Sequence, residues 1–209
     1  MQSDRIAVLD YGGGNVGSLL AALERRGASF ALTEDPREVV RAHAAILPGD
    51  GAFGATVDAL RDRGLDGAVR ETIAAGRPFL GICVGMQVLF DSSEEHGGAA
   101  GLGILPGNVR RFTNAPRVPH MGWNDLVIER THPFVDGLAD GAWAYFLHSY
   151  CVPAGADSLV AACEYGERFA AIVARDNVMA TQFHPEKSRA AGARLLDNFL
   201  RLATSHASP

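Results

Sequence analysis

The amino-acid sequence predicts an α/β fold: a central, mostly parallel β-sheet with helices on both faces and an antiparallel portion in the second half. Two observations predict it. Over residues 1–90, short apolar runs alternate with amphipathic segments of helical period, which is typical of parallel strands joined by helices. From residue 108 to about 181 only strand-like runs occur, so we expect antiparallel pairing there.

In the first half, each expected element has a local cause in the sequence. Strands are expected at the compact apolar runs 6–9, 30–32, 44–47 and 79–82. A first helix follows Asn15, a good N-cap, and stops near Gly27. Further helices are expected at 36–41, 56–63, 65–75 and 84–90, with proline at the start of the first and glycine between the next two.

The second half is expected to begin with an ordered loop over residues 91–107, because this segment is rich in glycine and polar residues. Strands are then expected at 109–112, 125–128, 144–147, 159–163, 170–174 and 178–181. The chain closes with an amphipathic helix over 190–203.

Composition sets limits on the class of protein. The chain has 209 residues, of which 47% are hydrophobic and 21% charged, so we expect one globular domain over 1–209. A net charge of -5 gives no sign of a basic face for nucleic acid. No apolar run is long enough for a signal peptide or a membrane span, so we expect no membrane association and a cytoplasmic location.

The three cysteines, Cys83, Cys151 and Cys163, are odd in number and lack the paired spacing of zinc sites. We therefore expect neither a disulfide framework nor a metal site. No part of the sequence calls for an organic cofactor.

Cys83 stands at the centre of PFLGICVGMQVLF, where an apolar strand stops and a helical pattern begins at once. With serine at the centre, the same pattern forms the nucleophile elbow of hydrolases, in which flanking glycines relieve a strained turn. Gly81 and Gly85 occupy those positions here. The alternative for this stretch alone is a buried structural cysteine, since free cysteine is among the most buried residue types.

Two further segments supply what a thiol nucleophile requires. His184 and Glu186 in HPEKS are two residues apart, so on extended backbone their side chains point the same way. They suit a base and the group that orients it. The glycine-rich loop PGDGAFG at 48–54 follows the third strand and can turn backbone amides toward an oxyanion, as can Val84 after the nucleophile.

A competing pattern lies near the start of the chain. Gly12, Gly14 and Gly17 satisfy G-x-G-x-x-G after a strand, and Glu34 and Asp35 follow at the distance of a ribose-binding acid. This pattern indicates dinucleotide binding. Against it, two residues separate the strand from the first glycine, and one of them would place a carboxylate near the pyrophosphate.

The chemical segments together resemble the class I glutamine amidotransferases, which carry counterparts of PGDGAFG, GICVGMQ and HPEKS in this order. LDYGGGNVGSL, PHMGWN at 119–124 and YFLHSY at 145–150 are similar to the glutaminase subunits of imidazole glycerol phosphate synthase, which act in histidine biosynthesis. This resemblance runs from Leu9 to the last helix. It implies a three-layer, flavodoxin-like fold.

The resemblance implies a role for each matching residue. Cys83 would form a glutamyl thioester, His184 would act as general acid and base, and Glu186 would orient His184. The oxyanion donors would be the backbone amides of Asp50 and Val84. Glutamine recognition would fall on Gly51, Gln87, His148, Ser149 and Tyr150.

The resemblance also implies a partner. Ammonia would pass into a (β/α)8-barrel cyclase subunit of a heterodimer. The matching interface positions are Asn15, Met121, Trp123 and Asn124, and Tyr145 and Lys187 match positions near the ammonia exit. Aspartate at position 50 departs from the valine common in the family, and a carboxylate beside a developing oxyanion would repel it unless it points away. The alternatives are another amidotransferase subunit, a thiol hydrolase, or a non-catalytic dinucleotide-binding module.

Overall fold

The computed structural model describes residues 3–13 and 16–207. Its main sheet has eight strands in the spatial order β2-β1-β3-β4-β14-β13-β12-β9. The first five are mutually parallel, and the last three join them antiparallel. In that order the strands are Phe30–Thr33, Ser3–Leu9, Ala42–Leu47, Phe79–Ile82, Val178–Thr181, Arg168–Arg175, Leu159–Glu164 and Val127–Ile128.

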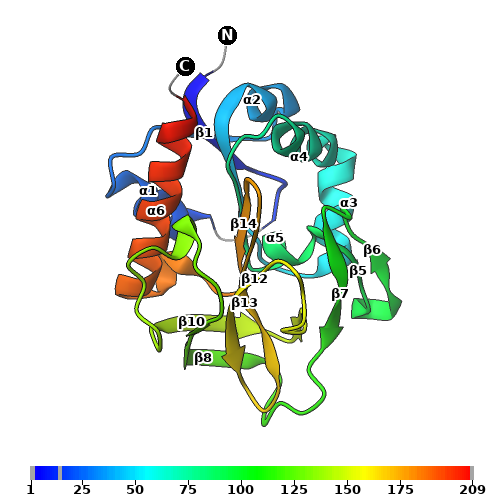
Figure 1. Ribbon diagram of the computed structural model, residues 1–209. Helices are drawn as coiled ribbons and strands as arrows, with labels where there is room; N and C mark the ends of the chain where they lie inside the picture. Colours follow the sequence, from blue (N-terminus) through cyan, green and yellow to red (C-terminus); the bar gives the residue numbers. More distant parts are fainter. Residues whose placement is uncertain (1–2, 14–15, 208–209) are drawn as a thin grey trace.

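Helices cover both faces of this sheet and complete a three-layer sandwich (Figure 1). The first and last helices, α1 (Gly17–Glu24) and α6 (Arg189–Ala207), lie on one face. The other face carries α2 (Pro36–Arg41), α3 (Phe53–Asp62), α4 (Leu65–Ala74) and α5 (Val84–Gln87). The predicted fold class, a mostly parallel sheet with an antiparallel second half, is confirmed.

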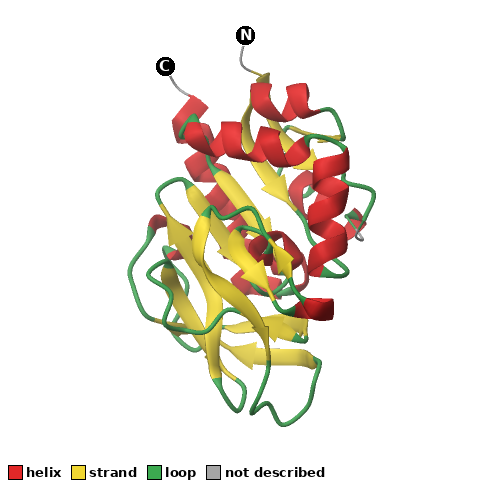
Figure 2. Cartoon of the chain, turned by 90° about the vertical axis from the view of Figure 1, so that its right-hand side faces the viewer, coloured by secondary structure: helices red, strands yellow, loops and turns green. Residues whose placement is uncertain are grey.

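Two smaller sheets extend the molecule beyond the three layers (Figure 2). One is the antiparallel ribbon of β8 (His120–Asp125) and β10 (Trp143–His148). The other runs in the order β11-β7-β5-β6, with strands Tyr150–Cys151, Leu105–Arg111, Phe90–Ser93 and Ala99–Ala100. Three 3-10 turns, η1 (Glu95–Gly97), η2 (Pro133–Val135) and η3 (Pro185–Lys187), join these parts.

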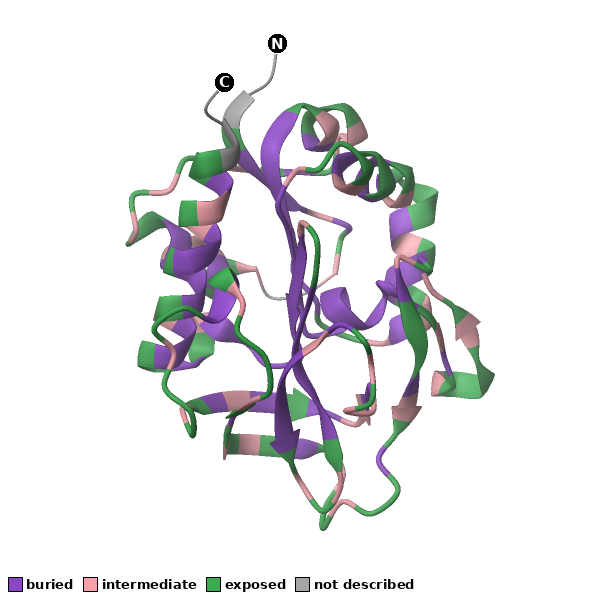
Figure 3. Cartoon of the chain, in the orientation of Figure 1, coloured by how far each residue is buried: buried purple, intermediate pink, exposed green. Residues whose placement is uncertain are grey.

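The core lies between the central strands and the helices (Figure 3). Every residue of β3 and β4 is buried. This burial explains their unbroken apolar sequences, because a parallel strand covered by helices on both faces has no solvent side. In the described part of the chain, no helix combines the length and the apolar character needed to cross a bilayer.

Several element boundaries differ from those predicted. The helix after Cys83 ends at Gln87 rather than Phe90, because Phe90 pairs with Leu105 in a second sheet. For the same reason the expected loop 91–107 contains β5, β6 and the start of β7. PHMGWN forms most of β8, although its polar and glycine residues hide a strand pattern. Helix α1 has Val16 as its N-cap, not Asn15, which lies outside the described residues.

Candidate active site

Cys83 lies in the sharp turn between β4 and α5. Its backbone has φ 54° and ψ −112°, a left-handed conformation that a non-glycine residue adopts at a cost of about 1–3 kcal/mol. The turn is held by a 2.7 Å bond from the Cys83 N–H to the Thr181 carbonyl and by two amides of α5 that donate to the Cys83 carbonyl. The side chain is 4% exposed. This is the geometry of a nucleophile elbow.

Glycines at the elbow permit a close approach of two backbone segments. A Cβ on Gly85 would lie 2.1 Å from the Leu47 carbonyl oxygen, and a Cβ on Gly49 would lie 2.1 Å from the Gly85 nitrogen. A side chain at either position would therefore force the loop 48–54 away from the elbow. The contact places the predicted oxyanion loop directly beside the start of α5. The Val84 N–H is the first of this helix and therefore has no hydrogen-bond acceptor within it.

His184 and Glu186 form the expected pair. The His184 Nδ1 lies 2.9 Å from the Glu186 Oε1, which leaves Nε2 for the cysteine. One premise was wrong: only His184 is extended, and Glu186 belongs to the 3-10 turn η3. Burial lowers the pKa of His184, but the Cys83 sulfur and the Glu186 carboxylate outweigh burial and raise this pKa to about 10. The imidazole is thus protonated at neutral pH.

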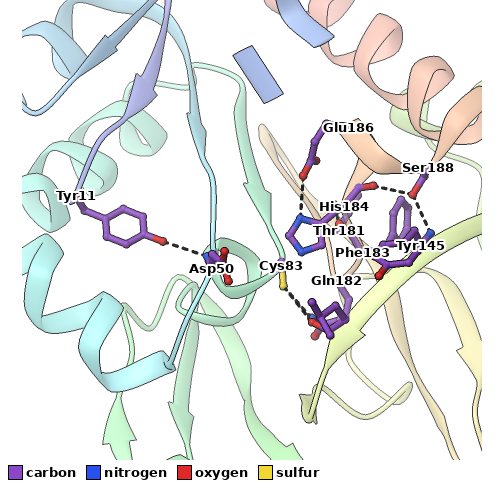
Figure 4. Close-up of polar contacts among 11 residues, drawn as sticks. Tyr11, Asp50, Cys83, Tyr145, Thr181, Gln182, Phe183, His184, Glu186 and Ser188 are labelled. Atoms are coloured by element: carbon purple, nitrogen blue, oxygen red, sulfur yellow. Dashed lines mark hydrogen bonds and ion pairs between the residues drawn. The ribbon is translucent and has the colours of Figure 1, made fainter. Parts of the chain in front are cut away.

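The backbone of His184 is fixed by a residue that the sequence did not single out. The buried Ser188 hydroxyl donates to the His184 carbonyl at 2.7 Å and accepts the Tyr145 N–H at 2.9 Å (Figure 4). The His184 N–H in turn donates to the Tyr145 carbonyl at 3.2 Å. Strand β10, which carries Tyr145, is therefore linked to the backbone of the candidate base once directly and once through Ser188.

A cavity of about 280 Å³ opens over Cys83, and every residue predicted to recognise glutamine lines it. These residues come from three separate segments: Gly51, Gln87, and the run His148, Ser149 and Tyr150. Burial lowers the pKa of His148 to about 3, so its ring is a neutral hydrogen-bonding group in the cavity wall.

Glu95 also lines this cavity, although sequence reasoning missed it. Its Oε2 accepts the Phe53 N–H at 2.7 Å, which caps the otherwise uncapped N-terminus of α3. This bond fixes a carboxylate at the rim of the pocket. A glutamate in a glycine-rich loop has no sequence signal that separates it from its neighbour Glu94.

The loop that contains Asp50 points its amide away from the nucleophile. The Asp50 N–H donates to the Tyr11 hydroxyl at 3.3 Å, on the side opposite Cys83 (Figure 4). The Asp50 residue is exposed. Asp50 also lines the cavity over Cys83, so its carboxylate stays close to the predicted oxyanion position, while its amide is already engaged. Of the two predicted oxyanion donors, the Val84 amide is then the one that is not bonded to Tyr11.

The β8–β10 ribbon presents an apolar outer face, which we call the ribbon face. It consists of Met121, Trp123, Trp143 and Leu147, exposed by 63%, 39%, 59% and 40%. The register places Met121 opposite Leu147 and Trp123 opposite Tyr145. The Arg189 guanidinium carbon lies 5.1 Å from the centroid of the Trp123 ring. An open cavity of about 730 Å³ adjoins the ribbon face and is lined on its other side by residues at the start of α6.

The other predicted interface and exit residues are placed differently. Asn124 lies on the opposite side of the ribbon, where its side chain donates to the Glu164 carbonyl at 2.9 Å. Asn15 lies outside the described residues. Lys187 is exposed, and it borders a small cavity of about 20 Å³ that also touches Gly49, His184 and Glu186.

The described part of the glycine pattern near the start of the chain serves local structure, while Gly14 lies outside the described residues. The Gly12 N–H donates to the Asp10 carboxylate at 2.9 Å, so a carboxylate stands where a pyrophosphate would bind. Asp35, the candidate ribose-binding acid, caps α2 by accepting the Arg37 N–H at 2.9 Å. Across the described residues, no three His, Cys, Asp or Glu side chains are grouped closely enough to hold a metal ion.

Comparison with known families decides the relationship. The model of the class I glutamine amidotransferases matches residues 7–203, which is nearly the whole chain. The chain belongs to this family. Curated amidotransferase relatives named imidazole glycerol phosphate synthase subunit HisH include one from Dehalococcoides mccartyi, 47% identical over 95% of this chain and 97% of its own. Another, from Salinibacter ruber, is 46% identical over 95% of this chain and 94% of its own length.

Solved amidotransferase structures share the fold. One described as a glutamine amidotransferase has a TM-score of 0.74 at 24% identity and covers 95% of this chain and 98% of its own. The PurLQS structure from Thermotoga maritima also has a TM-score of 0.74, at 20% identity, and the match covers 96% of this chain and 99% of that one. The three-layer amidotransferase fold is therefore established for this chain.

Proposed function

We propose that this chain is the glutaminase subunit of imidazole glycerol phosphate synthase and hydrolyses glutamine to glutamate and ammonia. One observation carries the proposal: Cys83 and His184 line one pocket, and Glu186 is hydrogen-bonded to the His184 ring. Two findings support it. The pocket belongs to an amidotransferase fold, and the chain spans 93–97% of the length of synthase subunits to which it is 46–47% identical.

In the first step, the Cys83 sulfur attacks the carboxamide carbon of glutamine, and the carbonyl oxygen becomes an oxyanion. The neighbouring imidazolium of His184 favours the thiolate form of Cys83. As the C–N bond breaks, His184 gives its Nε2 proton to the leaving nitrogen, and ammonia and a glutamyl thioester result. Glu186 holds the Nδ1–H, so the ring presents Nε2 throughout.

In the second step, a water molecule attacks the thioester carbon while His184 Nε2 takes its proton. The C–S bond breaks, and glutamate leaves with the sulfur again beside the imidazolium. Glu95 is well placed to receive the α-ammonium group of glutamine, because it is a fixed carboxylate at the rim of the same pocket.

The chain is expected to be weakly active by itself. The oxyanion needs two donors, and the Asp50 amide is bonded to Tyr11. Loss of one oxyanion donor typically costs about 10²–10³ in kcat. A partner that turns the Asp50 amide toward Cys83 would therefore raise turnover by a large factor without adding any catalytic side chain.

We assign the partner as a (β/α)8-barrel cyclase subunit that takes up the ammonia. The ribbon face supports docking, since an exposed apolar patch of this kind is typical of protein interfaces. Tyr145 and Lys187 are the exit residues of this proposal. The small cavity lined by His184 and Lys187 lies on the route that this proposal assigns to ammonia as it leaves the glutamine pocket.

A glutaminase assay tests the proposal. The purified chain is expected to release glutamate slowly from glutamine, and addition of the cyclase with its ribotide ligand is expected to increase the rate strongly. If no cyclase stimulates the chain, the synthase assignment fails, while Cys83-dependent glutamine hydrolysis would still identify an amidotransferase.

A further inference from the structure

A buried amide lies behind the nucleophile and has no role in the mechanism above. Gln182 is fully buried, and its side-chain nitrogen lies 4.0 Å from the Cys83 sulfur (Figure 4). That distance is at the outer limit of a hydrogen bond to sulfur. A carboxamide can present either N–H or oxygen to a neighbour, so the chemistry depends on which way this amide faces.

The Tyr150 carbonyl settles the orientation, because a carbonyl only accepts hydrogen bonds. It lies 2.9 Å from the Gln87 Nε2, so Gln87 must present its NH₂ group there. The second N–H of Gln87 points at the Gln182 Oε1, 3.0 Å away. An oxygen of Gln182 is thus committed to Gln87, and its NH₂ group is left facing the sulfur.

The same carbonyl orients a second branch of the network. The His148 Nδ1 lies 2.9 Å from the Tyr150 oxygen and must carry the hydrogen. His148 Nε2 is then an acceptor, and it receives the Nδ1–H of His120 at 3.1 Å. Burial keeps both rings neutral, with pKa values of about 3 for His148 and about 4 for His120. Every donor in this network therefore has one assignment.

From this geometry we propose that Gln182 is a further catalytic residue, whose NH₂ group donates a hydrogen bond to the Cys83 thiolate. The inference rests on the proposed function, since it takes Cys83 as the nucleophile. A hydrogen bond to a charged group stabilises that group by about 1.5–3 kcal/mol, which corresponds to roughly tenfold or more in the thiolate population. A neutral thiol gains much less, so the bond favours the reactive form.

The test is the pH dependence of Cys83 alkylation by iodoacetamide in the full chain, followed by mass spectrometry. Cys151 and Cys163 do not interfere, because burial raises the pKa of each to about 12. The titratable groups that interact directly with the sulfur are His184 and Tyr11, Glu186 is paired with His184, and Asp50, Glu95 and His148 line the same pocket; all of them stay unchanged. The test variant is Gln182→Met, which has similar shape and no N–H donor. The control is Thr72→Val, an equally buried change that removes a hydroxyl without a hydrogen-bond partner in the described structure.

Gln182→Met is expected to shift the alkylation midpoint upward and to lower the rate about tenfold at pH values below the parent midpoint. Thr72→Val is expected to keep the parent profile. A parent-like profile in a folded Gln182→Met chain would overturn the inference and leave the glutaminase proposal intact. Failure of Cys83→Ala to abolish glutamine hydrolysis would instead overturn the glutaminase proposal.

If Gln182→Met does not fold, the parent chain still decides. The side-chain NH₂ resonances of Gln182 are expected to move with the same midpoint as Cys83 alkylation in an NMR titration. Resonances that stay constant through that midpoint would contradict a bond to the sulfur.

Discussion

At the scale of single residues, surroundings separate side chains that are alike in the sequence. His184 and His148 line one pocket, yet the first is held protonated by Cys83 and Glu186 and the second is kept neutral by burial. The sequence indicated His184 because Glu186 stands two residues away. It could not reveal the opposite charge states, since these depend on burial and on partners brought from other segments.

The raised pKa of His184 leads to a prediction about pH. The imidazole signals of His184 should titrate near pH 10 rather than 6.5, and the midpoint should fall in Glu186→Gln. A pKa that is higher in the folded than in the unfolded chain stabilises the fold. This contribution is complete below pH 6.5 and disappears as the pH rises through about 10. NMR spectroscopy measures the midpoint, and a parent value near 6.5 would contradict the ion pair.

At the scale of elements, the sequence predicted most of the fold but not all of the site. Strand β4 begins and ends at the predicted residues because it is an unbroken apolar run. Helix α2 does so as well, because a proline at its first position marks its start. The β8 strand was missed because its pairing with β10, not its own pattern, makes it a strand. Ser188 and Glu95 were missed for a related reason: each acts through a hydrogen bond to a segment distant in sequence.

Ser188 should contribute to stability through its two hydrogen bonds. Ser188→Ala leaves the part-buried Tyr145 N–H and the His184 carbonyl without their partner, and this should lower the free energy of unfolding by about 1–3 kcal/mol. Ser158→Ala is a matched control, because the buried Ser158 hydroxyl has no hydrogen-bond partner within the described structure. Urea denaturation measures both. Equal losses for the two variants would show that the Ser188 bonds contribute nothing.

Tyr11 should restrain the oxyanion loop. Tyr11→Phe removes the hydroxyl that accepts the Asp50 N–H, so this amide becomes free to turn toward Cys83. The chain without its partner should then release glutamate faster, by about tenfold if the freed amide serves the oxyanion part of the time. Tyr165→Phe deletes the same atom from a ring that stacks on His120, and should leave the rate unchanged. A Tyr11→Phe rate at or below that of the parent would contradict the restraint.

At the scale of the whole molecule, the proposed docking surface and the candidate catalytic residues are connected through one strand. The outer face of β10 belongs to the ribbon face, and its backbone at Tyr145 bonds to His184 and Ser188. A partner seated on the ribbon face would therefore contact a strand that fixes the candidate base.

The ribbon face should carry much of the binding energy for the partner. Trp123→Ala removes a half-exposed aromatic side chain of the kind that dominates interfaces, and should weaken partner binding by about 2 kcal/mol, or roughly thirtyfold. Leu32→Ala is a suitable control, since Leu32 is also exposed but lies on β2 in the main sheet, outside the ribbon face. Calorimetric titration measures the affinities. Equal affinities for Trp123→Ala and the parent would place the partner elsewhere.

The central claim is that Cys83 releases ammonia from glutamine for use by a partner subunit. Its most direct test uses the Cys83→Ala chain in complex with the cyclase. Synthesis of imidazole glycerol phosphate is measured with glutamine and, separately, with an ammonium salt as the nitrogen source. We predict no detectable synthesis from glutamine and parent-like synthesis from ammonium, because only the step at the sulfur is lost. Synthesis from glutamine that survives Cys83→Ala would contradict the account.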